Sequence, residues 1–339
     1  MIFDLWKQIK RKEFSPIYLL YGTESFLINE TMQLLTDHVL TEEDIEFNLS
    51  SFDLTETPIE IALEDAETIP FLGEKKLLFL HNSYFLTAEK SKEKVEHNLA
   101  RLEAYLKEPA PYSIVVLVAP YEKLDERKKV TKALKKNTAL FEAKKLTEAD
   151  LKKWIITRAE YNGVVIEPKA VELILTLVGT NLFMLTSEID KMALYIGQAH
   201  VIDVKTVESL VARSLEQNVF TLVDKIVERK IEDALRIYYD LLTLNEEPIK
   251  ILAVITTQIR LIYQVKELAR RGYGQKQIAG HLKVHPFRVK LAAGQAQKFA
   301  EKELIGLIKQ LADADYKMKT GAMNKELLIE LILLKLNQK

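Results

Sequence analysis

The sequence contains no cysteine, and this absence removes several kinds of chemistry at once. Without thiols the chain has no disulfide, no cysteine nucleophile and no cysteine-based zinc site. No apolar run approaches the roughly 18 residues that a membrane-spanning helix needs, so we expect a soluble protein without membrane contact. The first residues also lack the long apolar segment of a secretory signal. Together these absences fit a cytoplasmic protein.

An excess of charge of one sign is absent too. The 48 Lys and Arg residues balance 49 Asp and Glu residues, which leaves a formal net charge of −1. Such a chain has no global field that draws it to nucleic acid, so any DNA contact must come from a local patch or from partner subunits. With 339 residues, of which 48% are hydrophobic, the chain is long enough for two or three domains.

The pattern up to about residue 143 predicts strands that alternate with helices. Strands are expected at 17–21, 47–54, 77–80, 113–119 and 139–143, with helices at 25–40, 58–68, 92–107 and 124–136. Continuous apolar runs such as SIVVLVA are typical of strands that are buried on both faces. We therefore predict an α/β domain over residues 1–143, with a mostly parallel five-stranded sheet covered by helices.

The pattern after this domain is helical almost throughout. Thr147 and Asp150 have the spacing of a capping box and are expected to begin the first helix. Glycines punctuate a first group of helices, and a second, longer group follows. We predict two all-helical domains, a small one at residues 144–212 and a larger one at residues 213–339.

A nucleotide site is suggested by the strand IYLLY, which is followed by Gly22 and a helix in the layout of a P-loop. A Walker A motif that starts at this glycine would need Gly, Lys and Ser or Thr where the chain has Leu27, Ile28 and Asn29. The strand at 113–119 also ends without an acidic pair for Mg²⁺. We expect no nucleotide or other cofactor, and Gly22 is most simply a turn residue that ends a strand. An active nucleotide hydrolase stays open as an alternative.

Metal and catalytic sites find little support in the pattern. His281 and His285 have i, i+4 spacing, but Pro286 interrupts the helix and no third ligand is evident. Loop and capping roles are the alternative for these histidines. Asp313 and Asp315 lie two residues apart on a predicted helix and therefore point in different directions. We expect no metal site and no intrinsic catalytic site.

Two segments are candidates for nucleic-acid contact. Residues 275–297 resemble a helix-turn-helix that could bring His285, Arg288 and Lys290 to a groove, although Lys283 stands where glycine is usual at the turn. A helical hairpin within a bundle is the alternative, and a DNA-binding regulator with an N-terminal α/β domain stays open as a function.

The other candidate is the basic helix near residue 130, which could contact phosphates through one face. Four lysines cluster on that face, namely Lys128, Lys132, Lys135 and Lys136. No aromatic residue interleaves with them to stack bases, so a solvated lysine face is the alternative.

The stretch AETIPFLGEKKLLFL places two adjacent hydrophobes, Phe71 and Leu72, at a turn between Pro70 and Gly73. Such a pair is either folded back into the core or held out for a partner. The sequence alone favours burial, because most adjacent hydrophobes belong to a core.

Several segments along the chain carry a resemblance through their order and spacing. They are TIPFLGEKKLLFL, NLFMLTSEIDKMALYIG, QNVFTLVDKIVERK, HPFRVKLAAGQAQKF, ADADYKMKTG and LLIELILLKL. In this order they resemble the delta subunit of the bacterial DNA polymerase III clamp loader, in the variant of low-GC Gram-positive bacteria. The first resembles the clamp-binding turn and its strand, the next two the second-domain helix and the entry to the third domain, and the last three the C-terminal collar.

The resemblance implies an AAA+ module without ATP hydrolysis, a helical lid and a collar for residues 1–143, 144–212 and 213–339. The family's delta subunit binds the beta sliding clamp and opens it for loading onto primed DNA during replication. Through the collar it assembles with tau/gamma and delta-prime subunits, which supply the ATP cycle, and the complex holds primer-template DNA. The chain would thus be a non-hydrolysing subunit of a DNA-directed DNA polymerase complex, a nucleotidyltransferase. The helix-turn-helix candidate then becomes part of the collar packing.

The resemblance also implies site residues. Phe71 and Leu72 match the two hydrophobes that enter a pocket on the clamp, with Ile69 beside them and Pro70 holding the turn. Glu67 stands where clamp-binding peptides often carry glutamine, a difference that affects an amide hydrogen bond there and leaves the hydrophobic anchor unchanged.

Overall fold

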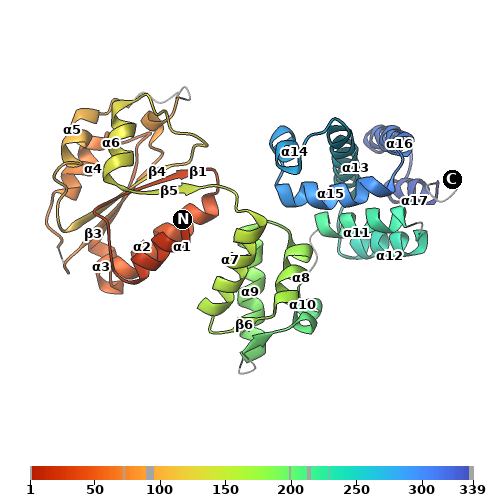
Figure 1. The fold of residues 1–339 in the computed structure, drawn as a ribbon, viewed down its shortest axis with the longest axis horizontal. Coiled ribbons are helices and arrows are strands. Elements are labelled where there is room, and N and C mark those ends of the chain that lie inside the picture. The colour runs from red at the N-terminus through yellow and green to blue at the C-terminus, as the bar shows by residue number, and fades with distance from the viewer. Residues whose placement is uncertain are drawn as a thin grey trace. The chain divides into compact units, whose positions relative to one another are not determined.

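The computed structural model describes residues 2–71, 73–88, 95–197, 200–211, 215–228 and 230–335. The chain divides into two compact units, Met1–Lys145 and Leu146–Lys339 (Figure 1). The first unit is the α/β domain that the sequence predicts, and the second is built mainly of helices. The further division of the second unit into a lid and a collar stays a prediction.

The first unit is organised around a five-stranded sheet in the order β2-β3-β4-β1-β5, in which all neighbouring strands are parallel. Parallel strands need crossover connections, and the alternation of strands and helices along the sequence supplies them. All residues of the central strand β4 are buried, as its apolar sequence predicts. The strands are β1 (Ile17–Gly22), β2 (Leu49–Asp53), β3 (Lys76–His81), β4 (Ser113–Ala119) and β5 (Ala139–Ala143).

Helices cover both faces of this sheet (Figure 1). On one face α4, α5 and α6 bury their apolar side chains against β1, β3 and β4 in one hydrophobic cluster. On the other face α2 packs on β1, β3 and β5, and α1 packs on α2. The helices are α1 (Ile2–Lys10), α2 (Ser25–Val39), α3 (Glu42–Asn48), α4 (Ile59–Ala66), η1 (Tyr84–Leu86, a 3₁₀ turn), α5 (Leu99–Tyr105) and α6 (Lys129–Asn137).

Three of the predicted elements begin more than one residue later in the structure, and the other bounds of this unit agree to within about two residues. The strand expected at 47–54 begins later, because Thr41 and Asp44 form a capping box that starts α3. The helix expected at 92–107 begins only at Leu99, where Asn98 caps it, and residues 92–94 lie outside the described part of the chain. The helix expected at 124–136 begins at Lys129. In the first two cases a capping side chain sets the start of the helix and overrides the apolar periodicity.

Gly22 ends β1, and its conformation gives this glycine a structural role that does not involve a nucleotide. Its φ is +128°, and a Cβ atom at this position would lie 2.1 Å from the carbonyl oxygen of Ala143 in β5. Only glycine permits this conformation and this close approach. The role as a strand-ending residue is therefore confirmed, and it explains the glycine by packing alone.

The second unit begins with helices α7 to α10 and two short parallel strands, which the sequence pattern did not predict. The expected cap is present, since the Thr147 hydroxyl accepts a hydrogen bond from the Asp150 N–H. The elements are α7 (Glu148–Tyr161), β6 (Val165–Ile166), α8 (Pro168–Val178), α9 (Leu182–Ile196), β7 (Val201–Ile202) and α10 (Val204–Leu210).

The rest of this unit is helical, and one hydrophobic cluster connects all of its helices from α11 to α17. They are α11 (Leu215–Val227), α12 (Ile231–Thr243), α13 (Pro248–Arg270), α14 (Gln275–Leu282), α15 (Pro286–Lys298), α16 (Glu301–Thr320) and α17 (Lys325–Lys335). Among the described residues, none of the helices is both long and apolar enough to cross a membrane.

Candidate protein-binding surface

The turn between α4 and β3 exposes large hydrophobic side chains. Phe71 is 76% exposed and Ile69 is 79% exposed, whereas hydrophobes of this size are usually buried in a soluble protein. Pro70 between them is half-buried. Leu72 lies outside the described residues. Of the two alternatives for this stretch, burial in the core therefore does not apply to Phe71.

Helix α3 contacts the turn at two positions. The backbone N–H of Phe71 donates a hydrogen bond to Oδ1 of Asn48, the fully buried last residue of α3, across 3.1 Å. Gly73 adopts a φ of +66° beside the same helix, where a Cβ atom would lie 2.7 Å from Oδ1 of Asp44. A side chain of α3 thus holds the backbone N–H of Phe71, and Gly73 packs closely against the same helix.

Lys76, the first residue of β3, binds the C-terminal end of α4 through three hydrogen bonds. This lysine is buried, and its ammonium group donates to the carbonyl oxygen of Asp65 at 3.0 Å, to Oδ1 of Asp65 at 2.5 Å and to the hydroxyl of Thr68 at 2.7 Å. All three donor positions of the ammonium group find an acceptor, which a buried charge requires. The C-terminal end of α4 is therefore fastened to the first residue of β3.

Glu67, the C-terminal cap of α4, is already engaged within the chain. Its carboxylate forms an ion pair with Arg101, and its carbonyl oxygen accepts a hydrogen bond from the Tyr112 hydroxyl at 2.6 Å. Both side chains of the ion pair are well exposed, so the pair is weakly stabilising and a partner could displace it. In this state one oxygen of the Glu67 carboxylate is held by Arg101.

Phe47 lies next to Phe71, although the sequence pattern placed it at the start of a strand. The ring centroids of the two residues are 5.4 Å apart with an interplanar angle of 35°, and Phe47 is itself 49% exposed. The signal that could have found it is the Thr41 and Asp44 capping box, which predicts that a helix begins just before Phe47.

The four lysines proposed to contact nucleic acid are not equivalent. The ammonium group of Lys128 donates to the carbonyl oxygens of Phe85 and Thr87 at 2.8 and 2.7 Å. Lys135 pairs with Glu126, and this hydrogen bond raises the pKa of Lys135 above its ordinary value.

Lys132 and Lys136, by contrast, are exposed and lie four residues apart on α6. DNA contact by this helix stays a prediction, and these two lysines are the best placed for it.

The helix-turn-helix candidate is built into the second unit. Lys283 adopts the left-handed conformation at the C-terminal cap of α14, so the absence of glycine there does not prevent the turn. His285 is buried and caps α15, with Nδ1 accepting from the Phe287 N–H at 3.1 Å and Nε2 donating to the carbonyl oxygen of Leu146 at 2.5 Å. The capping role of this histidine is confirmed.

A second proposed groove contact is also engaged. The Lys290 ammonium group binds both carboxylate oxygens of Glu148, at 2.9 and 3.0 Å. With His285 and Lys290 both used inside the unit, the geometry does not favour a DNA-reading helix. Within the described ranges, no group of three or more His, Asp or Glu side chains could hold a metal ion.

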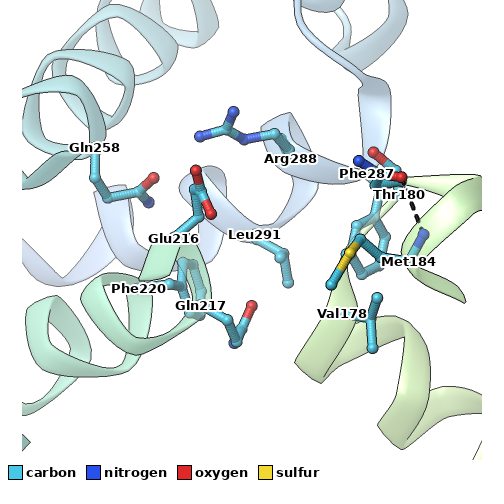
Figure 2. Close-up of a pocket in the computed structure, with 12 residues that line it drawn as sticks. Val178, Thr180, Met184, Glu216, Gln217, Phe220, Gln258, Phe287, Arg288 and Leu291 are labelled. Carbon is cyan, nitrogen blue, oxygen red and sulfur yellow. Dashed lines mark hydrogen bonds between the residues drawn. The ribbon is translucent and has the colours of Figure 1, made fainter. Parts of the chain in front are cut away.

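The second unit also contains an open pocket of about 290 Å³ (Figure 2). One wall comes from the connection between α8 and α9, with Val178, Thr180 and Met184, and the other from α11, α13 and α15. Figure 2 shows Glu216 and Arg288 among the apolar side chains of this pocket. The lining provides neither a nucleophile beside a base nor a set of phosphate-binding glycines, so we assign it no chemistry.

Comparison with known proteins identifies the family. The family model of the DNA polymerase III delta subunit matches residues 18–144, and that of its C-terminal domain matches residues 216–336. The DNA polymerase III subunit delta of Bacillus subtilis (strain 168) is 52% identical over 336 residues, which cover 99% of this chain and 97% of the relative. The chain belongs to the DNA polymerase III delta subunit family.

Two further comparisons extend this result. A probable DNA polymerase III subunit delta of Aquifex aeolicus (strain VF5) is 22% identical to this delta chain over 258 residues, 76% of this chain and 72% of the relative. The solved structure of the Bacillus subtilis DNA clamp loader delta protein superposes with a TM-score of 0.83 at 52% identity, covering 100% of both chains. The predicted resemblance to the delta subunit is thereby confirmed, and so is the predicted parallel five-stranded α/β architecture of the N-terminal domain.

Proposed function

We propose that this delta-family chain binds the beta sliding clamp through the turn at Ile69, Pro70, Phe71 and Leu72, and that it holds the ring open for loading onto primed DNA. The observation that carries the proposal is the 76% exposure of Phe71 on a turn whose backbone is fixed. A large hydrophobe on a rigid turn, exposed to water in the free protein, is typical of an anchor for a partner.

The binding free energy expected from burying these side chains is large enough for an anchor on the clamp. Burying Phe71 and Leu72 in an apolar pocket contributes about 3 to 5 kcal/mol before ordering costs. The ordering cost at Phe71 is small, because Asn48 already holds its backbone N–H. Ring opening follows if the chain binds the open ring more tightly than the closed ring, since a ligand shifts an equilibrium only by its differential affinity.

Assembly is assigned to a different part of the chain. We propose that residues 144–212 act as a lid and residues 213–339 as a collar that joins the tau/gamma and delta-prime subunits. The match of the C-terminal family model to residues 216–336 supports this division. Primer-template DNA would then be held by the whole complex, with Lys132 and Lys136 as this chain's phosphate contacts.

A pull-down with purified sliding clamp tests the proposal on the full-length chain. Wild type is compared with the Phe71→Ala, Leu72→Ala double variant and with Ile61→Ala, a control that removes a 49% exposed hydrophobe from the middle of α4. We expect the double variant to lose clamp binding while it still assembles with tau/gamma and delta-prime, and the control to bind normally. Clamp binding at wild-type affinity by the double variant would contradict the proposal.

A further inference from the structure

We propose that Phe47 is a second anchor of the clamp-binding surface, so that the clamp contacts two adjoining aromatic rings from different elements. One ring belongs to the turn after α4 and the other to helix α3. The inference rests on the proposed function and deepens it, because it adds a binding residue that neither the turn motif nor the apolar pattern of the sequence indicates.

The exposure of the two rings shows whether Phe47 is available to a partner or only shields Phe71 from water. Phe47 and Phe71 lie in aromatic contact, with centroids 5.4 Å apart, yet they remain 49% and 76% exposed. A residue that served to shield Phe71 in the free protein would leave it largely buried. Phe47 instead covers one side of the Phe71 ring and leaves both rings open to water, which extends the apolar surface beyond the turn.

The position of Phe47 is fixed by the same helix that fixes the turn. Asn48, the next residue, is buried and accepts the N–H of Phe71. At the other end of α3 the Asp44 carboxylate accepts from the Thr41 N–H and hydroxyl at 3.2 and 2.8 Å, which closes the capping box. Helix α3 therefore carries Phe47 and also holds the backbone of Phe71 through Asn48. Little conformational freedom is lost when a partner covers both residues.

The occupant follows from continuity with the turn. A clamp pocket that encloses the exposed side of Phe71 reaches atoms of the neighbouring ring, because the two rings are in contact. We assign the clamp an apolar pocket for Phe71 with an apolar rim that rests on Phe47. A paired arrangement of this kind, with a central aromatic anchor and a flanking hydrophobe that excludes water, is typical of binding hot spots.

The test measures the Kd of the full-length chain for purified sliding clamp by surface plasmon resonance. The variants are Phe47→Ala, Phe47→Leu, Phe71→Ala and the Phe47→Ala, Phe71→Ala double variant. Leu140→Ala is the matched control, because Leu140 is 41% exposed and lies on β5, at the sheet edge opposite β2.

The expected pattern is specific. Phe47→Ala raises the Kd about five- to tenfold and Phe71→Ala raises it more, as for flanking and central hot-spot residues. The double variant raises the Kd by less than the product of the single effects, because contacting residues are coupled. Phe47→Leu keeps much of the affinity, and Leu140→Ala leaves the Kd unchanged.

The possible failures are distinguishable. If Phe71→Ala weakens binding and Phe47→Ala does not, the second anchor is overturned and the proposed function stands. If Phe71→Ala itself binds like wild type, the proposed function is overturned together with the inference. Tighter clamp binding by Phe47→Ala would mean that Phe47 shields Phe71, and this result would also overturn the second anchor. Should Phe47→Ala fail to fold, the Kd of Phe47→Leu is compared with that of Phe47→Tyr. An anchor against an apolar rim predicts tighter clamp binding by Phe47→Leu, because the hydroxyl group of Tyr would be desolvated. Equal Kd values for these two variants would overturn the second anchor.

Discussion

The backbone N–H of Phe71, the residue that carries the exposed ring of the turn, donates a hydrogen bond to Oδ1 of the buried Asn48 across 3.1 Å. Asn48 is 0% exposed and Phe71 is 76% exposed. Because backbone and amide are locked together, the direction in which the ring projects is set by the interior of the α/β domain. The binding surface and the stability of this domain are therefore linked.

Replacing Asn48 by Ala is expected to weaken both properties. The variant removes the acceptor of a partly buried hydrogen bond, which costs about 1 kcal/mol of unfolding free energy. The chain has two tryptophans, Trp6 in the first unit and Trp154 in the second, so urea unfolding followed through Trp6 in a Trp154→Phe background reports the α/β domain.

Clamp affinity of Asn48→Ala should fall severalfold, because Phe71 is less well positioned before it binds. In a Phe71→Ala background the same replacement should change clamp binding little. An equal loss of affinity in both backgrounds would show that Asn48 acts independently of Phe71.

Gly73→Ala is expected to destabilise the α/β domain by more than the conformational penalty alone. A left-handed conformation costs a non-glycine residue about 1 kcal/mol. At Gly73 the new Cβ atom would also lie 2.7 Å from the Asp44 carboxylate, which cannot move without breaking its bonds to Thr41. Gly163→Ala is the control, since Gly163 has a φ of +73° and no atom within 4 Å of a Cβ. Equal losses for the two variants, each measured by urea unfolding, would contradict this account.

Lys76→Met is expected to lower the unfolding free energy of the α/β domain by about 2 kcal/mol, because it leaves a partly buried carboxylate of Asp65 without its cation. In an Asp65→Ala background the same replacement should cost less, since no carboxylate is then left unpaired. The comparison is a double-mutant cycle measured by urea unfolding. A coupling energy of zero would mean that the lysine acts through Thr68 and the carbonyl group alone.

The acid stability of the second unit is expected to depend on Asp190. Partial burial raises its pKa, but hydrogen bonds from Arg158 and Asn162 and the charge of Arg158 lower it by more, so the pKa lies below its ordinary value of 3.8. Arg158 binds both carboxylate oxygens, at 2.7 and 2.6 Å. A lowered pKa in the folded state stabilises the fold above the ordinary value, and this stabilisation is lost as the pH falls through the lowered value.

Between pH 7 and pH 3, the thermal midpoint of the wild-type unit should therefore fall further than that of Asp190→Asn, as followed through Trp154. The variant lacks the titrating group, and the remaining carboxylates are common to both proteins. Parallel loss of stability in the two proteins would show that this ion pair contributes nothing to the pH dependence.

The central strand β4 was readable from the sequence because a strand that is buried on both faces leaves a continuous apolar run. Both β4 and β5 were predicted with the bounds that the structure shows. Helix α3 was not predicted, because Phe47 was assigned to the strand that follows and the capping signal at Thr41 lies six residues before it. Where two local signals compete, periodicity alone does not decide which one sets the bound.

The surface was harder to predict than the fold. Nothing in the composition of the turn tells whether Phe71 faces inward, since the contact that holds its backbone comes from Asn48, 23 residues earlier in the sequence. His285 is a similar case, because its partner Leu146 is 139 positions away in the sequence. The apolar pattern states which residues can be buried, whereas exposure depends on which distant side chains complete the packing.

The order of the strands in the sheet has a consequence for biosynthesis. Strand β1 is made first, yet it lies between β4 and β5, which are made last. During translation β1 therefore has no partner until β4 has left the ribosome, and its outer edge stays unpaired until β5 follows. Sheets that depend on such distant pairings form slowly and expose aggregation-prone edges while they wait. We expect the α/β domain of a nascent chain to rely on chaperones until residue 143 has emerged.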